Sequence, residues 1–309
     1  MSSVSIKKTQ YGVFGNCVEI ENGKIKLVVT LDFGPRVIHC SIPGKQNMFY
    51  NDEKKAGLAQ PFAEFGGDIF RLYGGHRLWI SPEVLPRCYA PDNKPVAFTQ
   101  TEYGGCFTAP VEEGSLIQKS FCVTMADDEP SVTLEHTVKN CGMWEAELAP
   151  WAITMFAPGA KEVVPRQNPK AGLLTNGNIT TWDYTNMACR RVHWGRNFIT
   201  LYQDKNIANP IKFGVDNRSC WAAVFVGGQV LVKSFDFMED ALYPDNGCNF
   251  ETYTNGDFLE CESLGPLTLL DPGETLVHEE SWEIFTAEDA PDLSAVDEDK
   301  LAKTLEKYI

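Results

Sequence analysis

Short stretches in which apolar and polar residues alternate, separated by turn residues, run along most of this chain. The clearest is residues 132–138, where Leu134, His136 and Val138 occupy every second position and therefore share one face. An Asn-Gly pair at residues 22–23 lies between two such stretches, which is typical of a hairpin turn. Because helical periodicity is absent from these stretches, they predict antiparallel strands, and the shared face indicates a structural role for His136.

Only the end of the chain has a helical pattern. Asp292 or Ser294 can cap a helix in which apolar side chains recur near one face. No change in composition marks any other boundary, and all-β domains often exceed the usual domain length. The sequence thus predicts one large β-sandwich domain over residues 1–290, with a helical tail over residues 291–309 packed on it.

The charge balance excludes several classes of partner. Acidic residues outnumber basic ones by 42 to 27, which gives a formal net charge of −15. A strongly negative protein is not expected to bind nucleic acid or an anionic membrane surface. No apolar run approaches the roughly 20 residues that cross a bilayer as a helix, so a membrane-spanning protein is not expected either.

The chain has 10 cysteines, scattered without a Cys-x-x-Cys pair, and its first residues lack the apolar core of a secretory leader. This pattern favours free thiols in the reducing cytoplasm, although an even number of cysteines is also compatible with disulfides.

Residues 74–83 gather several chemically useful side chains directly after two glycines, namely His76, Arg77, Trp79 and Glu83. Glycines allow the backbone to approach a ligand closely, His and Arg can hydrogen-bond ligand oxygens, and Trp can face a sugar ring. The alternative is a structural turn with His76 in the core and Arg77 in a salt bridge.

A second candidate segment contains Glu260 and Glu262, which are two residues apart on an expected strand and therefore project from one face. Two carboxylates within reach of each other repel when both are ionised, which raises one pKa toward neutrality and suits proton transfer. The alternative is a pair of solvated glutamates on an exposed sheet face.

Other kinds of site have weaker support. The chain contains no Gly-x-Ser-x-Gly, His-Glu-x-x-His, Walker or Gly-x-Gly-x-x-Gly motif, and its 5 histidines are too dispersed to indicate a metal site. We therefore expect neither a metal nor an organic cofactor. In a loop-rich region, aromatic and basic side chains can either line a cleft or anchor packing: Trp182, Tyr184, Trp194 and Arg196.

These motifs together resemble the galactose mutarotase-like (aldose 1-epimerase-like) superfamily, in particular a bacterial branch with a Gly-Gly-His-Arg-Leu-Trp motif. The similarity extends from about residue 18 to residue 285. The segments that carry it are residues 29–38, 74–79, 89–93, 194–195 and 255–274.

The resemblance implies a β-supersandwich of two large, mostly antiparallel sheets that binds a saccharide on a concave face. In mutarotases a late-strand glutamate is the general base on the anomeric hydroxyl, and a histidine protonates the ring oxygen. Here Glu260 or Glu262 occupies the glutamate strand. The segment that carries the family histidine, residues 149–156, contains none, so His76 would have to replace it. We also expect Trp79, Glu83 and Trp151 to contact the sugar.

Three hypotheses follow for the function. The first is an aldose 1-epimerase-like enzyme in which Arg77 orients the sugar while His76 and a glutamate move protons. The second is a saccharide-binding domain without turnover, because a fold does not determine a reaction. The third is another reaction on an acidic sugar, whose carboxylate would be offset by Arg36, Arg77 and Lys233. In each case the expected partner is a small saccharide.

Overall fold

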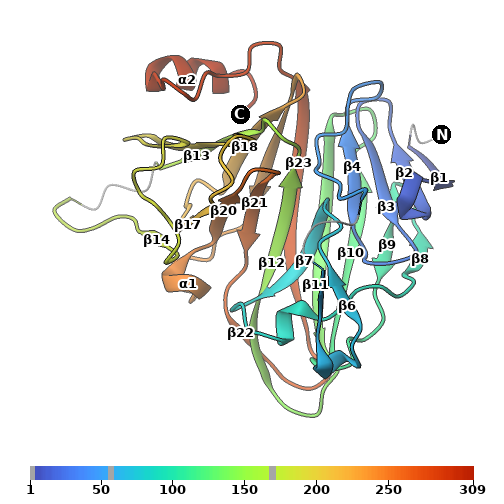
Figure 1. The fold of residues 1–309 in the computed structure, drawn as a ribbon. Helices are drawn as coiled ribbons and strands as arrows, with labels where there is room; N and C mark the ends of the chain where they lie inside the picture. Colours follow the sequence, from blue (N-terminus) through green and yellow to red (C-terminus); the bar gives the residue numbers. More distant parts are fainter. Residues whose placement is uncertain (1–3, 55–58, 167–171) are drawn as a thin grey trace.

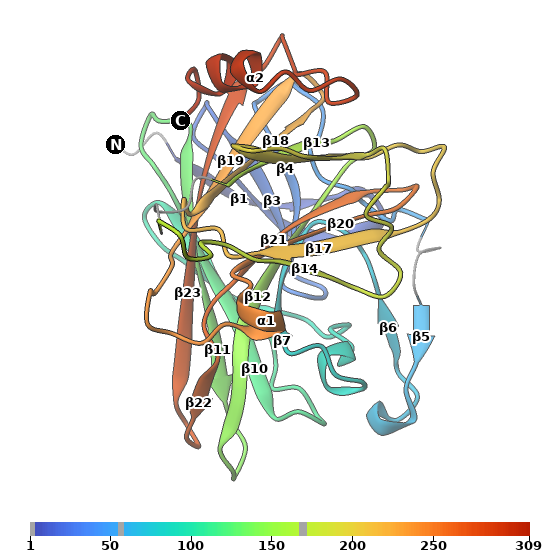
Figure 2. The same ribbon diagram turned by 90° about the vertical axis from the view of Figure 1, so that its left-hand side faces the viewer.

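Two large β sheets pack face to face in the structure, a computed structural model that describes residues 4–54, 59–166 and 172–309. Figure 1 looks onto one sheet, with the other sheet behind it and the C-terminal segment at the top, and Figure 2 shows the same arrangement after a quarter turn. Every strand pair in the described ranges is antiparallel, as a sandwich built from alternating segments requires. The predicted all-β fold of two large antiparallel sheets is confirmed.

The first sheet carries the candidate site segments near its centre. Its strands, in spatial order, are β1 (Ser5–Gln10), β2 (Asn16–Glu21), β3 (Lys26–Thr30), β4 (Val37–Ser41), β7 (His76–Ser81), β12 (Ala146–Phe156), β21 (Leu259–Leu264), β20 (Phe250–Thr254), β17 (Ile211–Val215) and β14 (Ile179–Thr181), with β22 (Thr268–Leu270) paired to one end of β12.

The second sheet lies behind the first. Its strands, in spatial order, are β15 (Val192–Trp194), β16 (Phe198–Tyr202), β13 (Lys161–Pro165), β18 (Trp221–Val226), β19 (Gln229–Phe235), β23 (Thr275–Thr286), β11 (Ser131–Asn140), β10 (Ile117–Met125), β9 (Gly104–Thr108) and β8 (Ala97–Gln100). A separate ribbon and short helical pieces complete the fold: β5 (Ala59–Pro61), β6 (Ile69–Arg71), α1 (Pro244–Gly247) and the single 3₁₀ turns Gly12–Phe14, Ala63–Phe65 and Arg87–Tyr89.

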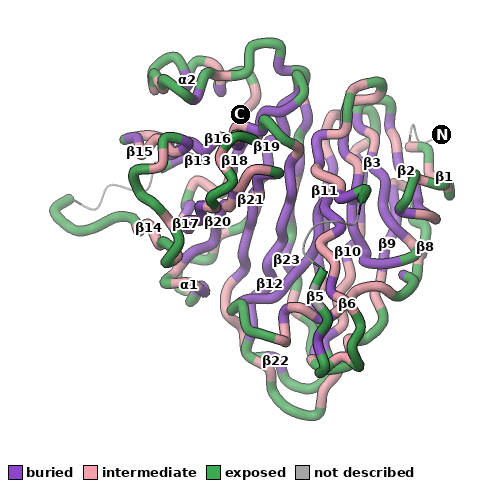
Figure 3. Tube along the Cα trace, viewed as in Figure 1, coloured by how far each residue is buried: buried purple, intermediate pink, exposed green. Residues whose placement is uncertain are grey.

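The main core fills the space between the two sheets, where Figure 3 shows the central strands to be buried. Alternation sends every second side chain into this space, for example Phe156 from β12 and Trp282 from β23, both fully buried. His136 of β11 lies there as well, with Leu134 and Val138 beside it, as the pattern predicted. We call the face of the first sheet that points away from the second sheet the outer face.

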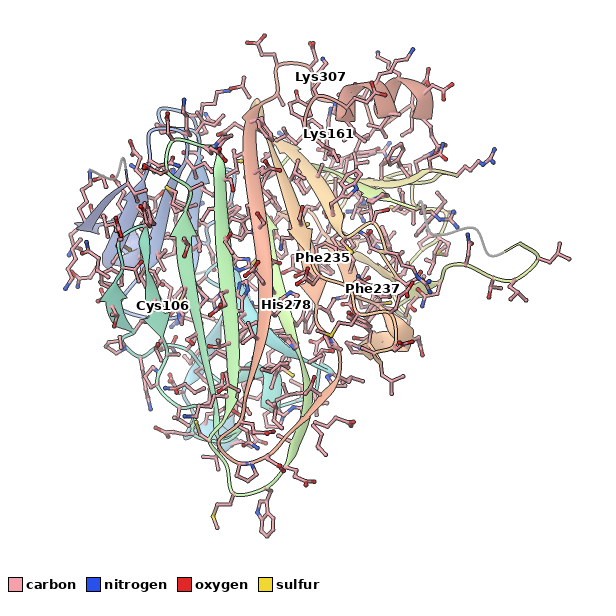
Figure 4. All side chains as sticks on the ribbon, turned by 180° about the vertical axis from the view of Figure 1, so that it is seen from behind. Cys106, Lys161, Phe235, Phe237, His278 and Lys307 are labelled. Carbon is pink, nitrogen blue, oxygen red and sulfur yellow. A yellow bond between two sulfur atoms is a disulfide. The ribbon has the colours of Figure 1, made fainter. Side chains whose placement is uncertain are left out.

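The C-terminal helix α2 (Glu298–Leu305) packs on the second sheet, on the side away from the first. Its Leu301 and Leu305 are buried against a cluster that includes Phe225 of β18. The cap differs from the predicted ones, because Asp297 accepts hydrogen bonds from the first turn. Figure 4 labels Lys161, whose Nζ donates to the Pro291 carbonyl at 2.7 Å and ties the tail to β13.

The prediction of free thiols is wrong for one cysteine pair. Cys106 and Cys122 form a disulfide across β9 and β10, where the register places them directly opposite each other; Cys106 is labelled in Figure 4. Their separation of 16 residues carries no disulfide signature in the sequence, because only the strand pairing brings them together. The other eight cysteines are free. In the described ranges, none of the helices has the length and hydrophobicity to cross a membrane.

A buried carboxyl between the sheets gives the first testable prediction. Burial raises the pKa of Glu162 on β13 to about 8. Since an unfolded glutamate titrates near 4.5, the contribution of this group to stability is complete below about pH 4.5 and is lost as pH rises through about 8. In the wild type, this effect should lower the free energy of unfolding by about 3–5 kcal/mol between pH 4.5 and 9. We expect the Glu162→Gln variant not to show this decrease.

Urea denaturation of wild type and variant across that pH range measures this difference. Glu135→Gln, on an exposed position of β11, is the matched control and should keep the wild-type pH dependence. Parallel pH curves for wild type and Glu162→Gln would contradict the assignment.

Candidate functional site

Three neighbouring strands bring the candidate residues of the early and late chain into adjacent rows. In the register of β7, β12 and β21, Arg77 lies opposite Ile153, which lies opposite Glu262. One step along, Trp79 lies opposite Trp151. Because side chains opposite one another in a sheet point to the same face, these residues all belong to the outer face.

Aromatic rings form the floor of this region. The rings of Trp79 and Trp151 have centroids 5.4 Å apart. The Arg77 guanidinium lies 3.9 Å from the Trp79 ring centroid and 5.5 Å from that of Phe70. A flat aromatic surface beside a cation and carboxylates is the combination with which proteins bind the apolar side and the hydroxyls of a sugar.

One lysine neutralises part of a carboxylate cluster beside this floor. Lys212 of β17 places its Nζ 2.8 Å from Glu251 Oε2 and 2.9 Å from Glu262 Oε2, and 4.4 Å from the Trp151 ring. Burial disfavours the charged lysine, but Glu262 and Glu251 together hold the pKa of Lys212 well above its ordinary value. Burial likewise raises the pKa of Glu251 to about 8.

The two glutamates of β21 differ in their surroundings. Glu262 is fully buried, and its Oε2 accepts hydrogen bonds from Trp151 Nε1 (2.7 Å) and Lys212 Nζ (2.9 Å). Glu260 is partly exposed. Burial, followed by the charge of Glu262, raises the pKa of Glu260 to about 8, against the opposing effect of Lys212 and Arg77. Glu262 is therefore a fixed acceptor, whereas Glu260 can take up or release a proton near neutral pH.

Two loop aromatics cover this part of the outer face. The Trp182 ring lies 4.8 Å from Lys212 Nζ, and Tyr184 is 43% exposed and within electrostatic range of both Lys212 and Glu262. At the rim, the exposed Glu83 accepts a hydrogen bond from the Tyr89 hydroxyl.

The other two loop residues lie elsewhere. Trp194 packs with its ring centroid 4.8 Å from that of Phe213 and donates to the Met187 carbonyl. Arg196 is exposed. Of the four loop residues considered from the sequence, the two that line the site are thus Trp182 and Tyr184.

The structure does not bring His76 to this face, which corrects the prediction that it acts on the same sugar as Glu260 or Glu262. Residues 76 and 77 are neighbours on β7, so when Arg77 points outward His76 must point between the sheets. His76 is fully buried there, 2.8 Å from Thr154 Oγ1 and 2.7 Å from His136 Nε2. Burial holds its pKa well below the ordinary value, so the imidazole is neutral.

Lys233 also lies between the sheets and not on the outer face, contrary to its predicted contact with substrate. Its Nζ donates to Glu280 Oε1 at 2.7 Å and to Thr154 Oγ1 at 2.7 Å. His76, His136 and Glu280 bring one possible ligand atom each within 4.8 Å of one another. The Lys233 charge already neutralises Glu280 and opposes a metal cation at this point.

Arg36 has a structural partner as well. It is 1% exposed, and its guanidinium forms an ion pair of 2.8 Å with Asp92 and donates to the Leu72 carbonyl. The two glycines before His76 allow a close approach, but of protein backbone and not of a ligand. A Cβ on Gly74 would lie 2.2 Å from the Tyr50 carbonyl oxygen, and both glycines have positive φ.

Sequence reasoning missed Lys212 and Glu251. Each is a single charged residue flanked by apolar or β-branched residues within a strand, Lys212 between Ile211 and Phe213, and Glu251 between Phe250 and Thr252. An isolated charge in such a stretch is a signal of a paired, partly buried group, although the partner cannot be named without the strand order.

Comparison with known proteins places the fold. No family profile and no curated protein matches the chain by sequence. Among solved structures, it is similar to a TPR-domain containing protein from Parabacteroides distasonis, with a TM-score of 0.60 and 15% identity. That match covers 91% of this chain and 48% of the other, so the chain spans about half the length of that protein.

Two further structures match over nearly their whole length. A galactose mutarotase-like protein from Lactobacillus casei has a TM-score of 0.55 and 10% identity, covering 87% of this chain and 100% of that one. The galactose 1-epimerase from Lactobacillus acidophilus has a TM-score of 0.50 and 10% identity, covering 93% and 100%. The chain therefore has the fold of the galactose mutarotase-like superfamily.

Proposed function

We propose that the protein binds a saccharide on the outer face of the first sheet and that Glu260 exchanges a proton with the anomeric hydroxyl of that sugar. The observation that carries the proposal is the position of Glu260, a partly exposed carboxyl with a pKa of about 8. Trp79 and Trp151 supply an aromatic surface on the same face, next to Glu262, to which Trp151 donates a hydrogen bond. A general base works best when its pKa is close to the working pH.

The buried neighbours support this role for Glu260. Lys212 and Trp151 both donate hydrogen bonds to Glu262, and the charge of Glu262 contributes to the raised pKa of Glu260. A fixed negative charge raises the proton affinity of the neighbouring carboxyl. When a sugar displaces water from the site, Glu260 is the carboxyl that can accept the anomeric proton. The bond between the anomeric carbon and the ring oxygen then breaks as the ring oxygen takes a proton from water or from a tyrosine such as Tyr184.

A second candidate function is saccharide binding without turnover, and the placement of the histidines favours it. His76, His136 and His278 are buried between the sheets. His39 is bonded to Tyr11 and Ser41, and His193 lies 4.0 Å from Glu298 of the C-terminal helix. None of the five imidazoles is therefore placed beside Glu260, so protonation of the ring oxygen would have to use a tyrosine, such as Tyr184, or water.

Substitution of Glu260 separates the two candidates. We expect Glu260→Gln to reduce anomer exchange by about 10²- to 10⁴-fold, the usual contribution of a general base, while saccharide binding is retained because the amide keeps the shape of the side chain. NMR exchange spectroscopy with neutral and acidic sugars measures the rate, and saturation-transfer NMR measures binding. Glu147→Gln, on an exposed position of β12, is the control. Wild-type rates equal to those in buffer, with binding present, would remove the catalytic proposal in favour of the second candidate.

The pH dependence of exchange is the next prediction. Only the deprotonated Glu260 is a base, so the rate should rise about tenfold per pH unit below its pKa and level off above about pH 8. Measurement of the exchange rate between pH 6 and 9.5, after subtraction of the buffer rate, tests this. A rate that falls over this range would show that the protonated form is the active one.

The correction for His76 leads to a separate prediction. We expect His76→Gln to lower the free energy of unfolding by about 1–3 kcal/mol, because the buried His136 and Thr154 each lose one of their hydrogen-bond partners. Anomer exchange per folded molecule should stay at the wild-type value. Urea denaturation and the NMR exchange assay on the same sample provide both quantities. Loss of exchange with unchanged stability would restore His76 as a participant in the reaction.

A further inference from the structure

A cavity of about 160 Å³ opens beside β7, at the side of the strand away from Glu260. In the first sheet, β4 and β7 are paired only at Val37 and His76, so the two strands separate beyond that point. The cavity lies at this separation, and residues of β10 in the second sheet, including Phe121, form its back wall. Arg77 and Trp79 belong both to this lining and to the outer-face site.

Arg77 carries unused hydrogen-bond donors at this cavity. Its side chain is 4% exposed, and within the described part of the chain its Nε and Nη1 have no hydrogen-bond partner. Burial, followed by the charge of Arg36, lowers the pKa of Arg77 to about 10, which still leaves the guanidinium charged at neutral pH. A buried cation without a bonded anion is costly unless a ligand supplies the partner.

The other basic side chains along the cavity are already paired. Arg36 pairs with Asp92 at 2.8 Å, and Lys119 pairs with Glu112. Lys94 pairs with Glu113. Among the basic residues of the lining, Arg77 is thus the one with no ion pair in the described ranges. An incoming anion is therefore expected to bind at Arg77 and not at the other basic side chains of the lining.

An acceptor also remains unused in the same cavity. Asp92 Oδ2 is engaged by Arg36, whereas Asp92 Oδ1 is buried with no hydrogen-bond partner among the described residues. A ligand that satisfies both groups needs an anionic acceptor for Arg77 and a hydroxyl donor for Asp92. A phosphate dianion would be repelled by that carboxylate oxygen more strongly than a carboxylate would.

We infer that the cavity takes the carboxylate of a sugar acid, with the carboxylate against Arg77 and an adjacent hydroxyl donating to Asp92 Oδ1. This inference rests on the proposed saccharide site and specifies its substrate class, because Arg77 lies between the cavity and the carboxylate cluster. The aromatic surface of Trp79 continues from one region to the other.

Calorimetric titration of the intact protein with three probes tests the inference: glucuronate, glucose and inorganic phosphate. A hydrogen bond to a charged group contributes about 1.5–3 kcal/mol, so glucuronate should bind about 10- to 100-fold more tightly than glucose. Arg77→Gln should abolish that preference. Lys94→Gln, which removes a lining cation that already has a partner, should preserve it.

Should Arg77→Gln fail to fold, the ¹H–¹⁵N signal of the Arg77 Nε–H group in wild type gives the same information. It should shift on addition of glucuronate and not on addition of glucose. Equal affinities for glucuronate and glucose, or tighter binding of phosphate than of glucuronate, would overturn the inference.

The outcomes also separate this inference from the proposed function. If glucose binds, if Trp151→Ala abolishes that binding and if glucuronate is not preferred, the proposed function stands. The inference of a sugar acid as ligand is then wrong. Glucuronate binding that depends on Arg77 but not on Trp151 keeps the cavity and removes the outer-face site. Absence of binding for all three probes, in protein that remains folded, removes both.

Discussion

The alternation of side chains along β7, β12 and β21 decides which polar groups of this protein meet. Each strand sends one residue to the outer face and the next into the space between the sheets. On β7 this separates Arg77 from His76, and on β21 it separates Glu262 from Cys261. Adjacent residues of the same strands therefore build two separate polar assemblies, an inner one between the sheets and an outer one on the outer face.

The inner assembly is closed and fully satisfied over several strands. Lys233 and Glu280 form its ion pair, and Ser263 and Thr154 extend it through their hydroxyls to His278 and His76. Such a network raises the cost of sliding one sheet over the other, because a shift would leave several buried groups without partners. The outer assembly differs, because Glu251 and Glu262 share the charge of Lys212 and Arg77 has no ion pair among the described residues.

Much of the fold could be predicted from the sequence, because the period-two pattern and the turns carry it directly. The shared face of Glu260 and Glu262 could also be predicted, since a two-residue spacing places both on one face whatever the register. The prediction for His76 was wrong because residues 76–81 form a strand, in which the adjacent His76 and Arg77 cannot both point to the outer face. Lys212 and the Cys106–Cys122 disulfide could not be assigned, because their partners depend on strand order, which one sequence does not contain.

The C-terminal helix limits how far the chain can be truncated. Besides covering Phe225 with Leu301 and Leu305, the helix holds the adjoining sheet edge through Glu298, whose carboxylate accepts hydrogen bonds from the backbone of Asn197 and Phe198. A chain trimmed at the last strand would expose an apolar surface and release the end of β16 in a single step. Glu298 in the first turn, together with Leu301 and Leu305, thus fastens the second sheet at this end.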